Sequence, residues 1–471
     1  MKLHLIALLW LIALFSSDNA TGKPNIILVM ADDQGWGDTG YNGHPVVKTP
    51  NLDAMSKDSL VFNRFYAAAP VCSPTRGSVL TGRHPFRIKI TNHGRYMRAQ
   101  ETTIAAELHD AGYVTGMFGK WHVGSAQKDS PVNPGNRGFD EWVIGLNFFD
   151  NDPYLSRNGI VEQIKGSGSA ITIDETIAFL NKHKDGKKPM FAIAWFPSPH
   201  SPHDEKPASN PKMYEGIDGG PYFAEITVLD TAFGRLRKEL RKLGIEKDTI
   251  LWYCSDNGGL RKESSGGRNK KGSIYEGGLR VPSLLEWPSH IPPGATAFPA
   301  NTSDILPTVL SMAKVTRKGK LALDGIDLTP VIEGKINRRK KGIGFWHNFQ
   351  QGQGTYSDRI LKAVMDAQQA GQPSPVPERL RKDIDEYPQF SEDKFMGHAA
   401  WLDWPWKLHR KEGTEVTYEL YNLKTHPMED QDLAKNPEQI DRMKTMKQNL
   451  ARWQLSVIRS LNGKDYSKNP R

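Results

Sequence analysis

The chain contains 471 residues, of which 38% are hydrophobic and 24% are charged. This length is sufficient for two domains with a large core, and the composition excludes a disordered or low-complexity chain. The net charge of +9 favours polyanionic partners. Because the basic residues are scattered and we find no nucleic-acid-binding motif, we expect an anionic polysaccharide, and no nucleic acid, as the partner.

Residues 1–22 have the pattern of a secretory signal peptide. Lys2 supplies a positive start, residues 5–15 form an apolar run too short for a stable membrane anchor, and small residues at 20–22 surround a cleavage point. No later segment of the sequence is apolar for long enough to cross a membrane. We therefore expect a secreted or periplasmic protein with no stable membrane anchor.

From residue 24 onward, short apolar runs alternate with amphipathic stretches. This pattern predicts an α/β fold with a mainly parallel sheet flanked by helices. The clearest predicted strands are residues 25–30, 113–118, 190–196 and 249–253. The predicted helices are residues 51–59, 102–111, 174–184, 222–243 and 304–313.

The last quarter of the chain has a different pattern. Residues 128–138, 201–221 and 341–378 are rich in proline and glycine, and we interpret them as surface loops. The third loop leads to a smaller α+β subdomain, in which residues 406–409 and 418–423 are predicted strands of an antiparallel sheet and residues 437–462 a closing helix. The predicted division is a main domain at 23–345 and a C-terminal subdomain at 346–471.

Polar side chains follow all four predicted strands of the main sheet. They are Asp32 and Asp33, then Lys120 and His122, then His200, and finally Asp256 and Asn257. Because ligands bind outside the carboxyl ends of parallel strands, we expect the four ends to converge on one crevice. The carboxylate and amide oxygens suit Ca²⁺ or Mg²⁺ rather than zinc, and Ca²⁺ is favoured because it tolerates irregular geometry. Taken singly, each acidic pair is more often a helix cap or a turn.

Residues 71–83, V-C-S-P-T-R-G-S-V-L-T-G-R, place a cysteine at a predicted helix start. Ser73 and Pro74 suit the N-cap and the first helical position, so Cys72 would lie at the positive end of the helix. Arg76 follows one turn later and can direct its planar donors at a tetrahedral oxyanion. The alternatives for Cys72 are a small buried hydrophobic side chain and a disulfide with Cys254.

The pattern C-x-P-x-R followed by T-G-R resembles the signature of the sulfatase family. G-K-W-H at 119–122, P-H-S-P at 199–202, D-N-G at 256–258 and the segment 271–282 match the family in the same order. The resemblance is to arylsulfatase-type enzymes, and among them to bacterial polysaccharide and glycosaminoglycan sulfatases. It implies an alkaline-phosphatase-like fold, with residues 23–345 as the catalytic domain.

The resemblance also implies the chemistry. A formylglycine-generating or anaerobic sulfatase-maturating enzyme would oxidise Cys72 to formylglycine, whose hydrated aldehyde is the nucleophile. His200 would protonate the leaving alcohol, and His122 would be the base that helps to release sulfate. The implied Ca²⁺ ligands are Asp32, Asp33, Asp256, Asn257 and the modified Cys72. The implied sulfate-binding residues are Arg76, Lys120, His200 and Lys271, with Lys270 and His203 as weaker local competitors.

The expected substrate is a sulfated carbohydrate. Five aromatic residues in predicted loops could stack on sugar rings: Phe148, Phe149, Tyr154, Trp346 and Trp401. For most of them the alternative is packing in the core or within the loops. The polar residues that could contact a sugar are His93, Arg95, Asp150, Asn151, His347 and His398, and the sequence singles out none of these six. Two alternatives remain, a phosphodiester or phosphonate monoester hydrolase of the same superfamily, and a non-catalytic glycan-binding protein if Cys72 stays unmodified.

Overall fold

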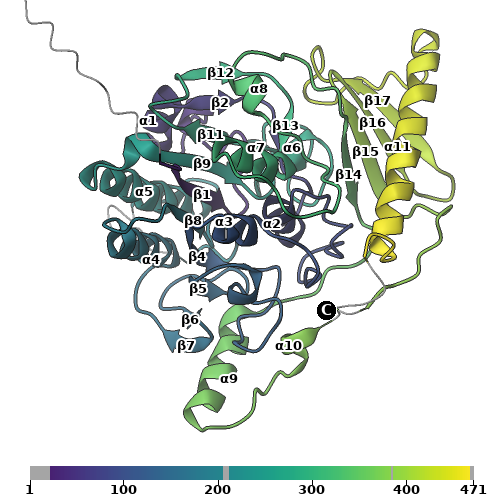
Figure 1. Ribbon diagram of the computed structural model, residues 1–471. Helices are drawn as coiled ribbons and strands as arrows, with labels where there is room; N and C mark the ends of the chain where they lie inside the picture. The colour runs from purple at the N-terminus through teal and green to yellow at the C-terminus, as the bar shows by residue number, and fades with distance from the viewer. Residues whose placement is uncertain (1–21, 205–211, 383, 385, 467–471) are drawn as a thin grey trace, which may run out of the picture.

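A ten-stranded sheet crosses the whole molecule and carries helices on both faces (Figure 1). The computed structural model describes residues 22–204, 212–382, 384 and 386–466. The strands, in spatial order, are β12 (Gly294–Thr296), β2 (Leu60–Phe62), β11 (Ser283–Glu286), β9 (Thr249–Ser255), β1 (Asn25–Ala31), β8 (Met190–Trp195), β4 (Val114–Lys120), β5 (Glu141–Gly145), β6 (Tyr154–Arg157) and β7 (Ile160–Gln163).

The four strands predicted from the sequence lie side by side at the centre of this sheet. β9, β1, β8 and β4 are neighbours, and each adjacent pair is parallel. Asn25 lies opposite Thr249, and Ala31 lies opposite Ser255. Since β1 and β9 end in register, the residues that follow them leave the sheet next to each other.

Alternate side chains of β1 enter two separate cores. Ile26, Leu28 and Met30 belong to one core and Ile27 and Val29 to the other. The second core also contains residues of α1 (Pro50–Asp58), α4 (Gly168–His183) and α5 (Gly220–Lys242). The first contains residues of α2 (Cys72–Thr81), α3 (Ile104–Asp110), α7 (Ile305–Met312) and α9 (Ser357–Gln369). Both faces of the sheet are therefore covered, as its apolar strands require.

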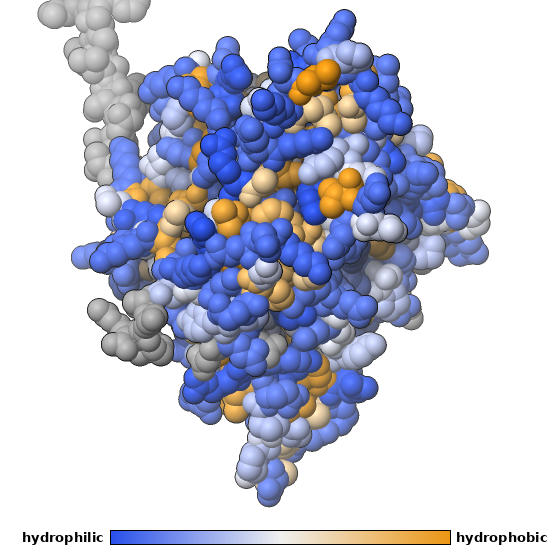
Figure 2. Space-filling view, turned by 90° about the vertical axis from the view of Figure 1, so that its right-hand side faces the viewer, coloured by the Kyte–Doolittle hydropathy of each residue, from blue (hydrophilic) through white to orange (hydrophobic). Residues whose placement is uncertain are grey.

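A second, antiparallel sheet lies beside the main body. Its strands are β14 (Ile343–His347), β15 (His398–Asp403), β16 (Trp406–Lys411) and β17 (Thr417–Asn422), and α11 (Ile440–Leu461) packs on it (Figure 1). A further three-stranded sheet contains β10 (Arg280–Val281), β3 (Phe65–Tyr66) and β13 (Ala300–Asn301). The short α-helices are α6 (Glu276–Leu279), α8 (Thr329–Ile332) and α10 (Glu378–Arg381). The side of the molecule that carries α11 is mainly hydrophilic, with small separate apolar patches (Figure 2).

The α/β fold class is confirmed, but two local predictions are wrong. Ser73 is not the N-cap, because α2 begins at Cys72 with Val71 as its cap, and Ser73 Oγ accepts the backbone N–H of Gly94 instead. Residues 341–378 are not one loop, because they contain β14 and α9. In both segments tertiary packing overrides the local turn signals.

The chain passes between the two sheets more than once. β14 joins the small sheet at Ile343, and α9 then contacts β6 and β7 of the large sheet. A domain boundary near residue 345 stays our proposal. Within the described residues, no helix is both long and apolar enough to cross a membrane. The predicted signal peptide, except for Gly22, lies outside the described residues.

Candidate active site

The ends of the central strands bring the predicted acidic residues together. Asp33 N donates to Asp256 Oδ1 at 3.1 Å, and Asn257 Nδ2 donates to Asp33 Oδ1 at 2.8 Å. Asp32, Asp33, Asp256 and Asn257 have no exposed surface. Asp33 has a φ of 74°, an uncommon value for a non-glycine residue. The backbone therefore turns sharply after β1 to direct two adjacent carboxylates at the same place.

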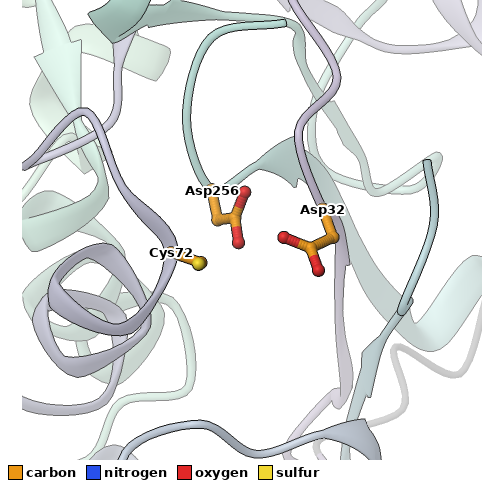
Figure 3. A group of neighbouring side chains, drawn as sticks. All are labelled: Asp32, Cys72 and Asp256. Carbon is orange, nitrogen blue, oxygen red and sulfur yellow. The ribbon is translucent and has the colours of Figure 1, made fainter. Parts of the chain in front are cut away.

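Cys72 lies beside two of these carboxylates. One ligand atom from each of Asp32, Cys72 and Asp256 lies within 4.8 Å of the other two, and all three residues are buried. Figure 3 shows the two carboxylates facing each other and the Cys72 sulfur pointing toward the space beside them. The first residue of α2 thus meets the ends of β1 and β9, as the sequence predicted.

Three cations surround the acidic cluster. Lys120 Nζ donates to Asp32 Oδ2 at 2.5 Å, and Lys271 Nζ donates to Asp33 Oδ2 at 2.6 Å. Arg76 donates to Asp256 Oδ2 from Nη2 at 2.7 Å and from Nε at 3.1 Å. The neighbouring Lys270 is exposed. Lys271 is therefore the lysine of this pair that contacts the acidic cluster.

Burial and neighbouring charges move the pKa values of two of these carboxylates in opposite directions. Burial, followed by the charge of Asp32, raises the pKa of Asp256 to about 7. Burial alone would also raise the pKa of Asp32, but Lys120, His200, Arg76 and Lys271 together hold it well below its usual value. A divalent cation would relieve the repulsion between the two carboxylates, since it would favour the ionised form of both groups.

Unpartnered oxygens indicate where such a cation would bind. Asp32 Oδ1 and Asn257 Oδ1 are buried and accept no hydrogen bond from the described residues. Buried acceptors without partners are rare in folded proteins. Together with the carboxylates of Asp33 and Asp256 they form a set of hard oxygen donors, which fits Ca²⁺ or Mg²⁺.

Cys72 is not a conventional thiolate nucleophile. Burial raises the pKa of its thiol, and the nearby Asp32 and Asp256 raise it further, although Lys120 and Lys271 act in the opposite direction. Cys72 and Cys254 are both free, so the disulfide alternative is wrong. An unmodified Cys72 would be a poor nucleophile in this environment, because the thiolate is the reactive form.

Two histidines complete the cluster. His200 Nε2 lies 3.8 Å from Asp33 Oδ2, and its ring stacks on Phe148 with a centroid separation of 4.4 Å. Burial lowers the pKa of His200 to about 4. His122 has a φ of 55°, and neither of its ring nitrogens is hydrogen-bonded to a described residue. Burial, and then Lys120 and Arg76, lower its pKa well below the usual value, so both rings are neutral.

The family model for sulfatases matches residues 24–315, more than half of the chain. The protein belongs to the sulfatase family. It is therefore a sulfuric ester hydrolase.

Known sulfatases resemble this chain over most of its length. It is 30% identical to N-acetylgalactosamine-6-sulfatase of Sus scrofa, covering 68% of each chain, and 29% identical to arylsulfatase A of Homo sapiens, covering 72% of this chain and 73% of the relative. Solved structures with lower identity show the same fold. The crystal structure of Ps i-CgsB in complex with k-i-k-neocarrahexaose superposes with a TM-score of 0.75 at 24% identity, covering 92% of this chain and 93% of that one. The phosphonate monoester hydrolase of Agrobacterium radiobacter superposes with a TM-score of 0.64 at 19% identity, covering 94% and 96%.

A cavity of about 400 Å³ in this sulfatase is lined by residues 148–151 and 356–359, among others. Its lining includes Phe148, which stacks on the His200 ring, and Tyr356, whose surface is 62% exposed. Asp150 and Asn151 line it as well. Phe148, Asp150 and Asn151 were among the residues predicted to contact a sugar, and Tyr356 was not; a sugar contact stays a prediction for all of them.

Phe149 also lines this cavity, although its side chain is buried. Other residues expected to contact a sugar lie elsewhere. Trp346 is fully buried in the core under α11. His398 lies on β15 against Tyr275 and His409. Loop composition alone could not separate these from Phe148, because burial depends on residues far away in the sequence.

The hydrogen bonds that hold the acidic cluster in place were not predicted from the sequence. Tyr222 OH donates to Asp38 Oδ2 at 2.6 Å or to the backbone carbonyl of Asp33 at 2.8 Å. Gly258 N donates to Gly278 O at 3.0 Å, which fixes the turn after Asn257 on α6. A Cβ atom on Gly258 would lie 1.9 Å from Gly277 O, so only glycine fits there. The D-N-G and E-G-G motifs are the only local signs of this contact.

Proposed function

We propose that the protein removes sulfate from sulfated carbohydrates, with a formylglycine made from Cys72 and a Ca²⁺ ion as its catalytic groups. The observation that carries this proposal is the buried group of Asp32, Cys72 and Asp256, surrounded by Arg76 and Lys120. Maturation by a formylglycine-generating or anaerobic sulfatase-maturating enzyme, and export by residues 1–22, belong to the same proposal.

The residues present fit both groups. Asp32, Asp33, Asp256 and Asn257 would hold the ion, and Ca²⁺ suits their irregular arrangement better than Mg²⁺ does. Bound there, Ca²⁺ would supply positive charge for a sulfate oxygen, and a hydrated aldehyde at position 72 would supply one hydroxyl for attack and a second for product release. The Cys72 sulfur marks the position of the aldehyde oxygen, because oxygen replaces sulfur on the Cβ atom.

The lysines are suited to hold the sulfate. Lys120 and Lys271 now neutralise Asp32 and Asp33 at 2.5 and 2.6 Å. With the cation site filled, the ammonium groups of Lys120 and Lys271 would be free to bind sulfate oxygens. Arg76 remains on Asp256 and adds positive charge beneath the reacting group. Such fixed charges stabilise the transition state because they need no reorganisation in the dry site.

Histidines are suited to move the protons. His200 faces Asp33, and its ring stacks on Phe148, which lines the 400 Å³ cavity. We therefore assign it the role of protonating the departing sugar oxygen. A bound sulfate would raise the pKa of His200, because negative charge favours the protonated ring. His122 is neutral and unpartnered among the described residues, and we assign it the role of base in product release.

The carbohydrate substrate is supported by two observations. Ps i-CgsB was crystallised with a neocarrahexaose, and the relative in Sus scrofa is named for a sulfated N-acetylgalactosamine. In this chain, the cavity beside His200 offers an exposed aromatic ring, Tyr356, next to the carboxylates of Asp150 and Asp358. Aromatic faces and carboxylates are suited to the apolar faces and hydroxyl groups of a sugar.

Sulfate and phosphate esters of the same alcohols test this function. We expect the matured protein to release sulfate from a defined panel of sulfated saccharides, and to turn over the corresponding phosphate monoesters and diesters at least about a hundredfold more slowly, about 2.7 kcal/mol of discrimination. The measurement is kcat/KM for each pair of esters. A preference for the phosphodiester would contradict the proposal and support the phosphonate-hydrolase alternative.

Leaving-group dependence tests the role of His200. We expect His200→Asn to lower kcat/KM for a sugar sulfate by about 10²–10⁴-fold, because a sugar alkoxide needs a proton as it departs. The loss on 4-nitrophenyl sulfate should be much smaller, since nitrophenolate is a good leaving group. His203→Asn is the matched control and should leave both rates unchanged. Equal losses on both esters would exclude the acid role.

A further inference from the structure

A second cleft lies between α11 and the segment that follows the end of α2. Its volume is about 550 Å³, which is in the range of pockets for small ligands. Arg83 and Arg87 line it from the segment after α2, Lys341 from the start of β14, and Arg452 and Trp453 from α11. Cys72 begins the ten-residue helix whose far end leads to this cleft, so the two sites are about 15 Å apart along the helix axis.

The cleft has more positive than negative side chains. Five cations line it, the four basic residues just named together with Arg459, against the carboxylates of Asp324 and Asp465. Arg87 pairs with Asp324 at 2.8 Å, Arg83 with Glu101 at 2.9 Å and also with Asp465, and Arg459 with Glu392 at 2.8 Å.

Two of these cations have no acidic partner among the described residues. Lys341 Nζ donates to the backbone carbonyl of Leu323 at 2.7 Å, and Arg452 Nη2 donates to the side-chain amide of Asn449 at 2.6 Å. Both side chains are exposed. An anion in the cleft would therefore be attracted by both groups.

Trp453 gives the cleft an apolar wall. One side of its indole is covered, because a Cβ atom on Gly344 would lie 2.3 Å from the ring and His84 packs edge-on at 4.8 Å. The ring is only partly buried and lines the cleft together with Leu323 and Leu455. An anionic ligand with an apolar face fits such a site better than an inorganic ion does.

We propose that this cleft is a non-catalytic binding site for a sulfated saccharide segment, which anchors a polymeric substrate away from Cys72. Sulfo groups would contact Lys341 and Arg452, and a sugar ring would pack on Trp453. The inference rests on the carbohydrate substrate proposed above. A glycan is favoured over nucleic acid because the cations lie around one aromatic ring in a single cleft, and are not spread along a groove with successive stacking platforms.

The double variant Lys341→Gln/Arg452→Gln tests this site in the full-length, matured protein. We expect the Kd for sulfated dextran to rise about tenfold and its salt dependence to weaken, because two contacts to the polyanion are lost. The kcat/KM for a sulfated polysaccharide should fall in parallel, whereas turnover of 4-nitrophenyl sulfate should be unchanged. Both residues are exposed, so an unchanged melting temperature should confirm that the variant is folded.

The matched control is Lys57→Gln/Arg241→Gln, which removes one lysine and one arginine from the exposed surfaces of α1 and α5. The inference is overturned if this control weakens binding equally, if the first variant leaves the Kd unchanged, or if it slows both substrates alike. It is also overturned if inorganic sulfate competes as well as sulfated dextran at equal sulfate concentration, or if single-stranded DNA competes better. Binding is measured without turnover, so its loss is separable from failure of the proposed enzymatic function.

Discussion

The Cys72→Ser variant is expected to lose sulfate release from every sulfate ester, by at least about 10³-fold. A serine hydroxyl can attack sulfur only once, because the sulfated serine has no second hydroxyl to expel the sulfate. The aldehyde hydrate proposed for position 72 has both. The measurement is sulfate released per protein in the steady state, and a retained rate within tenfold of wild type would exclude the aldehyde mechanism.

Two controls separate loss of the nucleophile from loss of the site. Calorimetric titration of the Cys72→Ser variant with Ca²⁺ should still show binding, because Asp32, Asp33, Asp256 and Asn257 are unchanged. In the wild-type protein from its native host, mass spectrometry of the tryptic peptide from Phe65 to Arg76 should show an aldehyde in place of the thiol. An unmodified peptide from an active preparation would contradict the proposal.

The Lys407→Met variant is expected to lower the free energy of unfolding by about 3–5 kcal/mol. Lys407 is fully buried on β16, and its Nζ lies 2.9 Å from Glu276 Oε1 and 3.1 Å from Glu429 Oε1. Removal of the ammonium group leaves two buried carboxylates without their cation. Thermal and urea unfolding followed by circular dichroism measure the loss.

The matched control for this variant is Lys444→Met, an exposed lysine on α11 whose replacement should change stability by less than about 0.5 kcal/mol. Adding Glu276→Gln to Lys407→Met should recover part of the loss, because one of the two uncompensated charges is then removed. If Lys407→Met unfolds like the wild-type protein, the buried ion pairs contribute little to the junction between the two sheets.

The chemistry of the candidate site was predictable because it lies at strand ends. Apolar runs locate β1, β4, β8 and β9, and the polar residues after each run follow directly in the sequence. The geometry of a parallel sheet then brings Asp32 and Asp256 together without any knowledge of the loops. Lys271 lies on no strand, and it was found only through the resemblance to sulfatases.

Other features left no local signal. β14 and α9 lie within a segment rich in glycine and glutamine, and Ile360, Leu361 and Val364 mark a helical face that is too short to outweigh that composition. The ion pair between Lys407 and Glu276 joins residues 131 positions apart, and the Tyr222–Asp38 contact spans 184 positions. Such contacts are fixed by the packed structure, not by neighbouring residues in the sequence.

The contacts of α6 limit how this enzyme can be truncated or joined to parts of another sulfatase. Its glycines support the turn that carries Asn257, while its Glu276 is neutralised by Lys407 of the small sheet. The portion that matches the family ends at residue 315, well before Lys407. An enzyme truncated after residue 315 would keep every residue to which we assign a catalytic role. It would, however, leave the carboxylate of Glu276 without the ammonium group of Lys407, next to the turn that carries Asn257. Chimeras between sulfatases should therefore exchange the tail and the α6 segment as one unit.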